Sequence, residues 1–174
     1  MPGPEGAVTV ASMRSVSEQE LRASFVNCSK GEAKRLAVPP KLSEQRWDDL
    51  DFLGWSDPAA PDRAYLVAER DGDVIGVALR SAVAQAHRPT MCTLCLTTHP
   101  GSGVCLMTAR KAGPSGRQGN SVGTYICSDL DCSLYVRGVK RPPVGGRLKE
   151  ALSQEEQIER TRSNVFAFLD RVAG

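Results

Sequence analysis

Two close-spaced pairs of cysteines are the residues of this chain whose types and spacing best suit a chemical role. The first pair is Cys92-Thr-Leu-Cys95, and the second pair, Cys127 and Cys132, begins 32 residues after Cys95. Each short loop can present two thiolates to one ion at a sulfur–zinc distance of about 2.3 Å, and four thiolates suit tetrahedral zinc. The spacing therefore predicts one zinc ion held by Cys92, Cys95, Cys127 and Cys132.

Other uses of these cysteines fit the sequence less well. A thioredoxin-like redox site needs a single Cys-x-x-Cys pair inside a βαβ unit and would leave the second pair unexplained. A disulfide framework needs an oxidising compartment, and the chain opens with Met-Pro-Gly-Pro-Glu-Gly instead of a basic, then apolar, signal peptide. A catalytic zinc keeps one coordination position open, and the zinc deaminase pattern of His-x-Glu followed by Pro-Cys-x-x-Cys is absent. Four thiolates close the site, which favours a structural role.

Two further residues, His99 and Cys105, could compete for the metal. His99 follows Cys95 by four residues, so its imidazole could replace one thiolate or form a hydrogen bond to a ligand sulfur. Cys105 lies in a strand-like run, and Cys28 lies on a predicted helix. We expect both to be reduced cysteines packed in the core.

The composition describes one modest domain with few aromatic side chains and little net charge. The chain has 174 residues, a net charge of +2, an aromatic share of 5%, 16 Gly and 11 Pro. A core of this kind would gain from a metal ion, because zinc binding contributes roughly 10–16 kcal/mol in small zinc modules. Stretch 101–150 is nevertheless basic, with only three acidic residues. Its basic residues are Arg110, Lys111, Arg117, Arg137, Lys140, Arg141, Arg147 and Lys149.

The sequence shows neither a membrane span nor an export signal. No apolar run reaches the roughly 18 residues that a membrane helix needs, and the longest candidate, 74–86, is interrupted by Arg80. Reduced metal-binding thiols are typical of the cytoplasm. We therefore expect a soluble, cytoplasmic protein that is monomeric.

The N-terminal part is predicted to become ordered at its first capping signal. Residues 1–16 begin with several Pro and Gly and are expected to be disordered. Ser17 and Glu20 form a capping box, which predicts a helix of about twelve residues that ends near Gly31. Residues 43–53 could add a short turn of helix.

Two β-hairpins are expected in the middle of the chain. Asp71-Gly72 supplies the positive φ values of a tight turn between strands 64–70 and 74–80. A second pair of strands, 104–109 and 121–127, lies between the two thiol pairs. A short helix that begins near Asp129 and includes Cys132 would complete a treble-clef arrangement of knuckle, hairpin and helix.

These elements predict an α+β fold: a small antiparallel sheet with a treble-clef zinc finger and flanking N- and C-terminal helices. The zinc-finger domain, with its N-terminal helix and hairpin, would span residues 17–136. Residues 137–152 combine basic side chains with Pro and Gly and are predicted to be an extended linker. Ser153 and Glu156 form a further capping box, which opens a helix at 153–174 that packs on the domain.

With these motifs in place, the chain resembles the C-terminal treble-clef zinc-finger domain of the elongation factor G-binding proteins, the fusidic-acid-resistance type also described as fibronectin-binding. The resemblance covers about residues 17–172. The motifs that carry it are Arg22-Ala-Ser-Phe-Val-Asn27, Trp47-Asp-Asp-Leu-Asp-Phe-Leu-Gly-Trp55, Cys92-Thr-Leu-Cys95-Leu-Thr-Thr-His99-Pro-Gly-Ser-Gly103, Gly119-Asn-Ser-Val-Gly-Thr-Tyr-Ile-Cys127 and Cys132-Ser-Leu-Tyr-Val-Arg137. It implies a structural zinc site, in which a histidine can take part, and recognition of the translocation factor on or near the ribosome. We expect no separate N-terminal helical bundle, so drug resistance is not carried over.

Two functions of different classes are compatible with these features. The first is a non-catalytic module that binds elongation factor G or a ribosome-associated protein through the zinc-held hairpin and an aromatic and basic surface. The candidate partner-binding residues are Arg110, Lys111, Arg117, Tyr125, Tyr135 and Arg137. The alternative is an RNA-binding zinc module in which basic residues contact phosphates. The candidates for that role are Arg110, Lys111, Arg117, Lys140 and Arg141. No Ser/His/Asp, paired-carboxylate or phosphate-loop arrangement indicates an enzyme.

Overall fold

The computed structural model describes residues 12–82, 90–144, 146–147 and 149–174. The strands are β1 (Leu53–Asp57), β2 (Ala60–Arg70), β3 (Asp73–Ser81), β4 (Thr90–Met91), β5 (Thr97–His99), β6 (Val104–Arg110), β7 (Ser121–Cys127) and β8 (Gly146–Arg147). The helices are α1 (Glu18–Ala23), α2 (Lys30–Arg35), α3 (Gly113–Arg117), α4 (Cys132–Val136) and α5 (Gln154–Ala173), with 3-10 turns η1 (Leu42–Glu44), η2 (Trp47–Asp49) and η3 (Gly101–Gly103).

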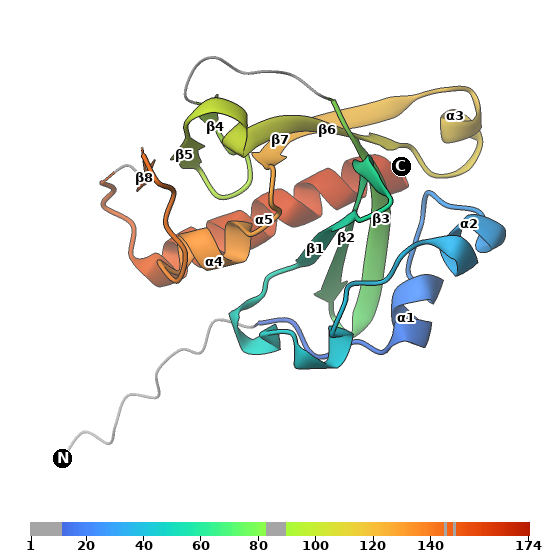
Figure 1. The fold of residues 1–174 in the computed structure, drawn as a ribbon, viewed down its shortest axis with the longest axis horizontal. Coiled ribbons are helices and arrows are strands. Elements are labelled where there is room, and N and C mark those ends of the chain that lie inside the picture. The colour runs from blue at the N-terminus through green and yellow to red at the C-terminus, as the bar shows by residue number, and fades with distance from the viewer. Residues whose placement is uncertain (1–11, 83–89, 145, 148) are drawn as a thin grey trace.

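A five-stranded antiparallel sheet forms the centre of the molecule. Its strand order is β1-β2-β3-β6-β7. A second sheet has the order β4-β5-β8, and its strands β4 and β5 lie on either side of Cys92 and Cys95 in the sequence. The main sheet lies between α5 on one side and α1 and α2 on the other (Figure 1). The predicted α+β class with a small antiparallel sheet is confirmed.

Both predicted hairpins are present. Asp71 and Gly72 connect β2 to β3 with φ values of 53° and 87°, the left-handed backbone that a tight hairpin turn requires. Gly72 has no side chain to resist this conformation, and its N–H donates to Glu69 Oε1. Strands β6 and β7 pair from Val104 opposite Cys127 to Arg110 opposite Ser121.

The predicted N-terminal helix is wrong in length. Two helices of six residues, α1 and α2, occupy the region, and each begins with its own capping box. Ser17 and Glu20 cap α1 as predicted, whereas Ser29 and Glu32 form a second capping box that starts α2. That second motif is the sequence signal for the interruption.

The connection between α1 and α2 is non-helical because its backbone pairs with β3. Phe25 forms a bridge with Gly76, the N–H of Val26 donates to Gly76 O, and the N–H of Gly76 donates to Ser24 O. A side chain at position 76 would not fit, since its Cβ would lie 2.5 Å from Ser24 Oγ. Cys28 therefore lies in this connection and not on a helix; it is a half-buried free cysteine.

Residues 12–16 are ordered, which corrects part of the expectation for the N-terminus. Met13 and Val16 are buried, and the N–H of Met13 donates to Leu50 O at 2.8 Å. Both side chains pack in the cluster that contains Leu21 and Trp55. Residues 1–11 of the predicted disordered start lie outside the described residues.

The main sheet separates two hydrophobic clusters. In β2, Leu66 and Val67 are both fully buried, and alternation sends them to opposite faces. Val67 joins the cluster beneath α1 and α2, whereas Leu66 joins a larger cluster that includes the four zinc-site cysteines and α5. The zinc site is therefore continuous with the larger core.

The C-terminal helix forms as predicted. Ser153 Oγ accepts from the N–H of Glu156, and the buried side chains of Ile158, Val165 and Leu169 lie in the larger core. Within the described ranges, neither α5 nor any shorter helix has the length and apolar character needed to cross a membrane.

Residues 137–152 are not the extended linker that was predicted. Their backbone is attached to the domain, because the N–H groups of Val139 and Lys140 both donate to Leu134 O. Strand β8 then pairs with β5, and Glu150 accepts hydrogen bonds from Arg160 of α5. Gly138 and Gly146 adopt positive φ values of 70° and 135°, which redirect the chain along the domain.

Candidate metal centre

The structure brings the four predicted cysteine ligands together. Cys92, Cys95, Cys127 and Cys132 are each 0% exposed, and their Sγ atoms all lie within 4.8 Å of one another. The Sγ–Sγ distances are 3.6 Å for Cys92–Cys132 and 3.5 Å for Cys95–Cys127. Sulfurs bound tetrahedrally to zinc at about 2.3 Å are separated by about 3.8 Å, so this arrangement fits one ion.

The first knuckle is a tight loop around Cys92 and Cys95. The N–H of Cys95 donates to Cys92 Sγ at 3.4 Å, and the N–H of Leu96 donates to Cys92 O at 2.9 Å. Leu96 adopts a left-handed backbone with φ 60°, which turns the chain back toward β5. The N–H of Thr93 donates to Tyr125 O on β7, so the knuckle is attached directly to the hairpin.

The second knuckle connects the end of β7 to the start of α4. Cys127 is the last residue of β7, and Cys132 is the first residue of α4. Between them, Leu130 has φ 61°, and its N–H donates to Cys127 O at 2.9 Å. Leu130 packs directly over Gly54 of β1, where a Cβ atom would lie 2.6 Å from the Leu130 Cβ. The two knuckles and the hairpin between them therefore form a treble clef, with α4 as its helix.

A family model described as the FBP C-terminal treble-clef zinc-finger matches residues 20–172. The chain belongs to this treble-clef zinc-finger family. The match extends from α1 to the end of α5, so the family domain includes the whole sheet and not only the knuckles.

A similar fold occurs in a solved structure, that of the fusidic acid resistance protein FusC. The two chains share 14% sequence identity with a TM-score of 0.57, and the likeness covers 93% of this chain and 60% of that chain. The present chain thus corresponds to 60% of the length of that protein. No curated protein matches the sequence.

In this treble-clef zinc finger, the zinc is a structural cofactor held by four cysteines. All four sulfurs are buried and lie close together. They would fill the four coordination positions of a tetrahedral zinc ion, so no position would remain for a reacting water. When bound, the ion supplies a covalent link between the two knuckles. The surrounding residues orient the thiolates and exclude water.

His99 lies beside the sulfur cluster as a hydrogen-bonding neighbour of one ligand. Its Nε2 is 3.3 Å from Cys127 Sγ, and its ring meets the Tyr135 ring edge-on at 4.6 Å between centroids. Thr97 Oγ1 lies 3.3 Å from the sulfur of another ligand, Cys95. With thiolates bound to zinc, both groups can donate hydrogen bonds to sulfur and reduce the negative charge of the site.

Replacement of His99 by phenylalanine distinguishes a neighbour from a ligand. We expect His99→Phe to keep one zinc per chain, because the ring contact with Tyr135 remains and four sulfurs still close the site. The affinity for zinc should fall about 10–100-fold, since the hydrogen bond to Cys127 is lost. A competition titration with a chromophoric chelator measures this change. Loss of the zinc stoichiometry itself would show that His99 is a ligand.

Charged side chains fix the second knuckle from outside. The Tyr135 hydroxyl donates to Asp129 Oδ2 at 2.6 Å, and Lys140 Nζ lies 2.9 Å from Asp129 and 2.7 Å from Asp131. Burial acts to raise the pKa of Asp129, but the hydrogen bonds from Tyr135 and Lys140 outweigh it and hold that pKa below its usual range. The loop between Cys127 and Cys132 is therefore held by an ionised carboxylate.

Arg147 fixes the first knuckle from a distant part of the chain. This residue of β8 donates to the carbonyl oxygen of Cys95 and, at 2.9 Å, to Thr97 Oγ1. It also donates to Gln157 Oε1 of α5 at 2.9 Å. Arg147 follows Cys95 by 52 residues, and no local motif marks it as a partner of the first knuckle.

The six residues predicted to bind a partner do not form one exposed surface. Tyr135 is 5% exposed, and the Arg137 side chain is 10% exposed because it forms hydrogen bonds to both oxygens of Asp51. Arg110 contacts the α1–α2 connection through Asn27 O. Residues of the prediction that remain exposed are Arg110, Arg117 and Tyr125, whereas Lys111 is half-buried. Tyr135 and Arg137 are thus structural residues.

Proposed function

We propose that this treble-clef zinc finger is a non-catalytic, cytoplasmic protein-binding module that recognises elongation factor G at the ribosome. The observation that carries the proposal is the extent of the likeness. Residues 20–172 match the family, and the fold of a fusidic acid resistance protein follows 93% of the chain. Elongation factor G is the partner that the sequence resemblance implies.

The closed zinc site supports a binding role over catalysis. Four buried sulfurs surround the site, and the nearest polar side chains, His99 and Thr97, are directed at sulfurs and not at a substrate position. Zinc here makes the hairpin and α4 rigid. A rigid surface loses little conformational entropy on binding, which favours recognition of a folded partner.

Tyr125 is the most prominent candidate anchor for such a partner. Its side chain is 50% exposed. Its backbone is held in place, because the Tyr125 carbonyl oxygen accepts a hydrogen bond from the N–H of Thr93 in the first knuckle. Met91, directly before Cys92, is 38% exposed. Exposed Tyr and Met side chains on rigid backbone are typical of the centres of protein interfaces.

The RNA alternative receives less support from the structure. Lys140 is paired with Asp129 and Asp131, and Arg110 is paired with Glu32 at 3.4 Å. These two candidates for phosphate contacts are therefore already neutralised within the protein. Binding that weakens steeply with salt would nevertheless indicate phosphate contacts.

Calorimetry with purified elongation factor G and the zinc-loaded chain tests the proposal. We expect a one-to-one complex with a Kd below the order of tens of micromolar and a shallow dependence on salt. Tyr125→Ala should weaken the complex about 10-fold or more, as expected for an interface anchor. Leu152→Ala, which removes a 38% exposed side chain outside the two knuckles and their hairpin, is the control and should have no effect. Absence of binding in this range would contradict the proposal.

A further inference from the structure

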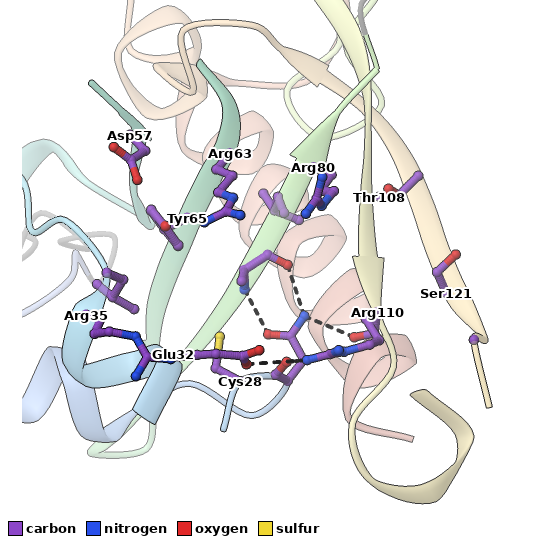
Figure 2. Close-up of a pocket in the computed structure, with 15 residues that line it drawn as sticks. Cys28, Glu32, Arg35, Asp57, Arg63, Tyr65, Arg80, Thr108, Arg110 and Ser121 are labelled. Atoms are coloured by element: carbon purple, nitrogen blue, oxygen red, sulfur yellow. Dashed lines mark hydrogen bonds and ion pairs between the residues drawn. The ribbon is translucent and has the colours of Figure 1, made fainter. Parts of the chain in front are cut away.

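A cavity separate from the zinc site opens on the face of the main sheet that carries α1 and α2. Its volume is about 580 Å³, and its lining comes from the α1–α2 connection, α2, β2, β3, β6 and the start of β7 (Figure 2). Volumes of about 300–1,000 Å³ are typical of small-molecule sites. The N-terminal helices cover one end of this sheet face and leave the other end accessible.

The strand register places basic and hydroxyl side chains in one row across the floor. Arg63 of β2 is directly opposite Arg80 of β3, and Arg80 is directly opposite Thr108 of β6. Residues directly opposite each other in antiparallel strands share a face, so these side chains project into the same space, as Figure 2 shows. Two like charges in this position destabilise the sheet unless an opposite charge lies between them.

Two of the four arginines in the cavity have no hydrogen-bond or ion-pair partner in the described part of the protein. Among the described residues, the guanidinium groups of Arg35 and Arg63 form no hydrogen bond or ion pair. Arg80 makes only a 3.4 Å contact with Asp62, and its side chain is 67% exposed. Arg110 is the exception, because it contacts Asn27 O and Glu32 and forms one wall of the cavity.

The charges around the cavity favour an anion. Four arginines line it together with two carboxylates, Glu32 and Asp57, which leaves an excess of two positive charges. Burial, followed by the nearby Glu32 charge, raises the pKa of the Cys28 thiol to about 11. Cys28 therefore stays neutral at physiological pH and does not reduce the positive potential.

We propose that this cavity binds the phosphate group of a small phosphate monoester, held between Arg63 and Arg80, with Arg35 of α2 as a further positive charge in the lining. A phosphate monoester carries close to two negative charges and three strong acceptor oxygens, which matches the excess charge and the number of available guanidinium groups. The lining contains arginine and no lysine, and the planar guanidinium fork suits bidentate contact with phosphate. This inference does not depend on recognition of elongation factor G.

Calorimetry of the zinc-loaded chain in phosphate-free buffer tests the site with ribose 5-phosphate and inorganic phosphate as probes. We expect saturable one-to-one binding of ribose 5-phosphate with a Kd below about 1 mM, and at least about 10-fold weaker binding of acetate. Acetate that binds as tightly as the phosphates would overturn the assignment to phosphate. The absence of phosphate binding at about 10 mM would overturn the site itself.

Three variants locate the binding. Arg63→Gln should weaken ribose 5-phosphate binding at least about 10-fold without lowering the unfolding temperature of the ligand-free protein, because it removes the repulsion with Arg80. Asp57→Asn should tighten binding, since a negative charge leaves the lining. Arg171→Gln, an equal charge change at an exposed position of α5 outside the lining, should leave binding unchanged. Equal weakening by Arg63→Gln and Arg171→Gln would mean diffuse attraction and no site.

A short single-stranded RNA separates a phosphate monoester from a polynucleotide. We expect an oligonucleotide without terminal phosphate to bind no better to the wild type than to Arg63→Gln. If instead the oligonucleotide binds through Arg63 while ribose 5-phosphate does not bind, the proposal is overturned in favour of an RNA-binding groove.

Discussion

Cys132→Ser is expected to lose its zinc and to unfold the zinc-finger half of the protein. Cys132 is 0% exposed, its sulfur lies 3.6 Å from Cys92 Sγ, and its side chain belongs to the larger core. Structural zinc contributes roughly 10–16 kcal/mol in small modules, whereas a whole domain is stable by only about 5–15 kcal/mol. Loss of the ion therefore removes a free energy comparable with the entire free energy of unfolding of the domain. Zinc content by native mass spectrometry and tertiary structure by near-ultraviolet circular dichroism measure the result.

Cys105→Ser is the matched control for that substitution. Cys105 is a half-buried free cysteine of β6, and it is outside the group of four converging sulfurs. We expect this variant to keep one zinc per chain. Its free energy of unfolding should lie within about 1–2 kcal/mol of that of the wild type, as for an ordinary substitution at a partly buried position. If Cys132→Ser still bound zinc and had the same unfolding temperature as Cys105→Ser, the structural role of the ion would be refuted.

Arg137→Ala is expected to lower the free energy of unfolding by about 3–5 kcal/mol. Arg137 of the segment after α4 donates to both carboxylate oxygens of Asp51, at 2.7 and 3.1 Å, and the Asp51 side chain is 0% exposed. Removal of the guanidinium would leave a buried carboxylate without its partner. The N–H of Asp51 also donates to Ser133 Oγ, so this contact joins the segment before β1 to α4. Urea denaturation followed by tryptophan fluorescence gives the change in stability.

An exposed ion pair provides the comparison for Arg137. Arg46 and Asp49 lie 2.6 Å apart, but their side chains are 60% and 31% exposed. Arg46→Ala should cost about 0–1 kcal/mol, because water screens the charges and replaces the contact. Equal losses in Arg46→Ala and Arg137→Ala would show that the Asp51 contact does not hold the two parts of the fold together.

The zinc site and most elements could be predicted because their signals are local. The spacing of Cys92, Cys95, Cys127 and Cys132 indicates the metal, the Asp71-Gly72 turn indicates the first hairpin, and the capping box at Ser153 marks the start of α5. Each turn or capping signal depends on residues within a few positions of one another, and each thiol pair is equally local, although the two pairs are 32 residues apart. The family resemblance then indicated how these pieces combine.

The features that sequence analysis missed depend on contacts between distant segments. Phe25 leaves the helical conformation because its backbone pairs with Gly76, which helical periodicity around Phe25 cannot reveal. Tyr135 and Arg137 have the chemistry of interface residues, yet Asp129 and Asp51 hold them inside the fold. The arginine-lined cavity likewise arises only when β2 and β3 bring Arg63 opposite Arg80.

X-ray absorption at the zinc edge of the purified protein identifies the atoms bound to the ion. Four converging, buried sulfurs predict one zinc ion per chain with four sulfur neighbours at about 2.3 Å and no nitrogen in the first coordination sphere. A spectrum that required three sulfurs and one nitrogen at about 2.0 Å would place His99 in the site and contradict the account.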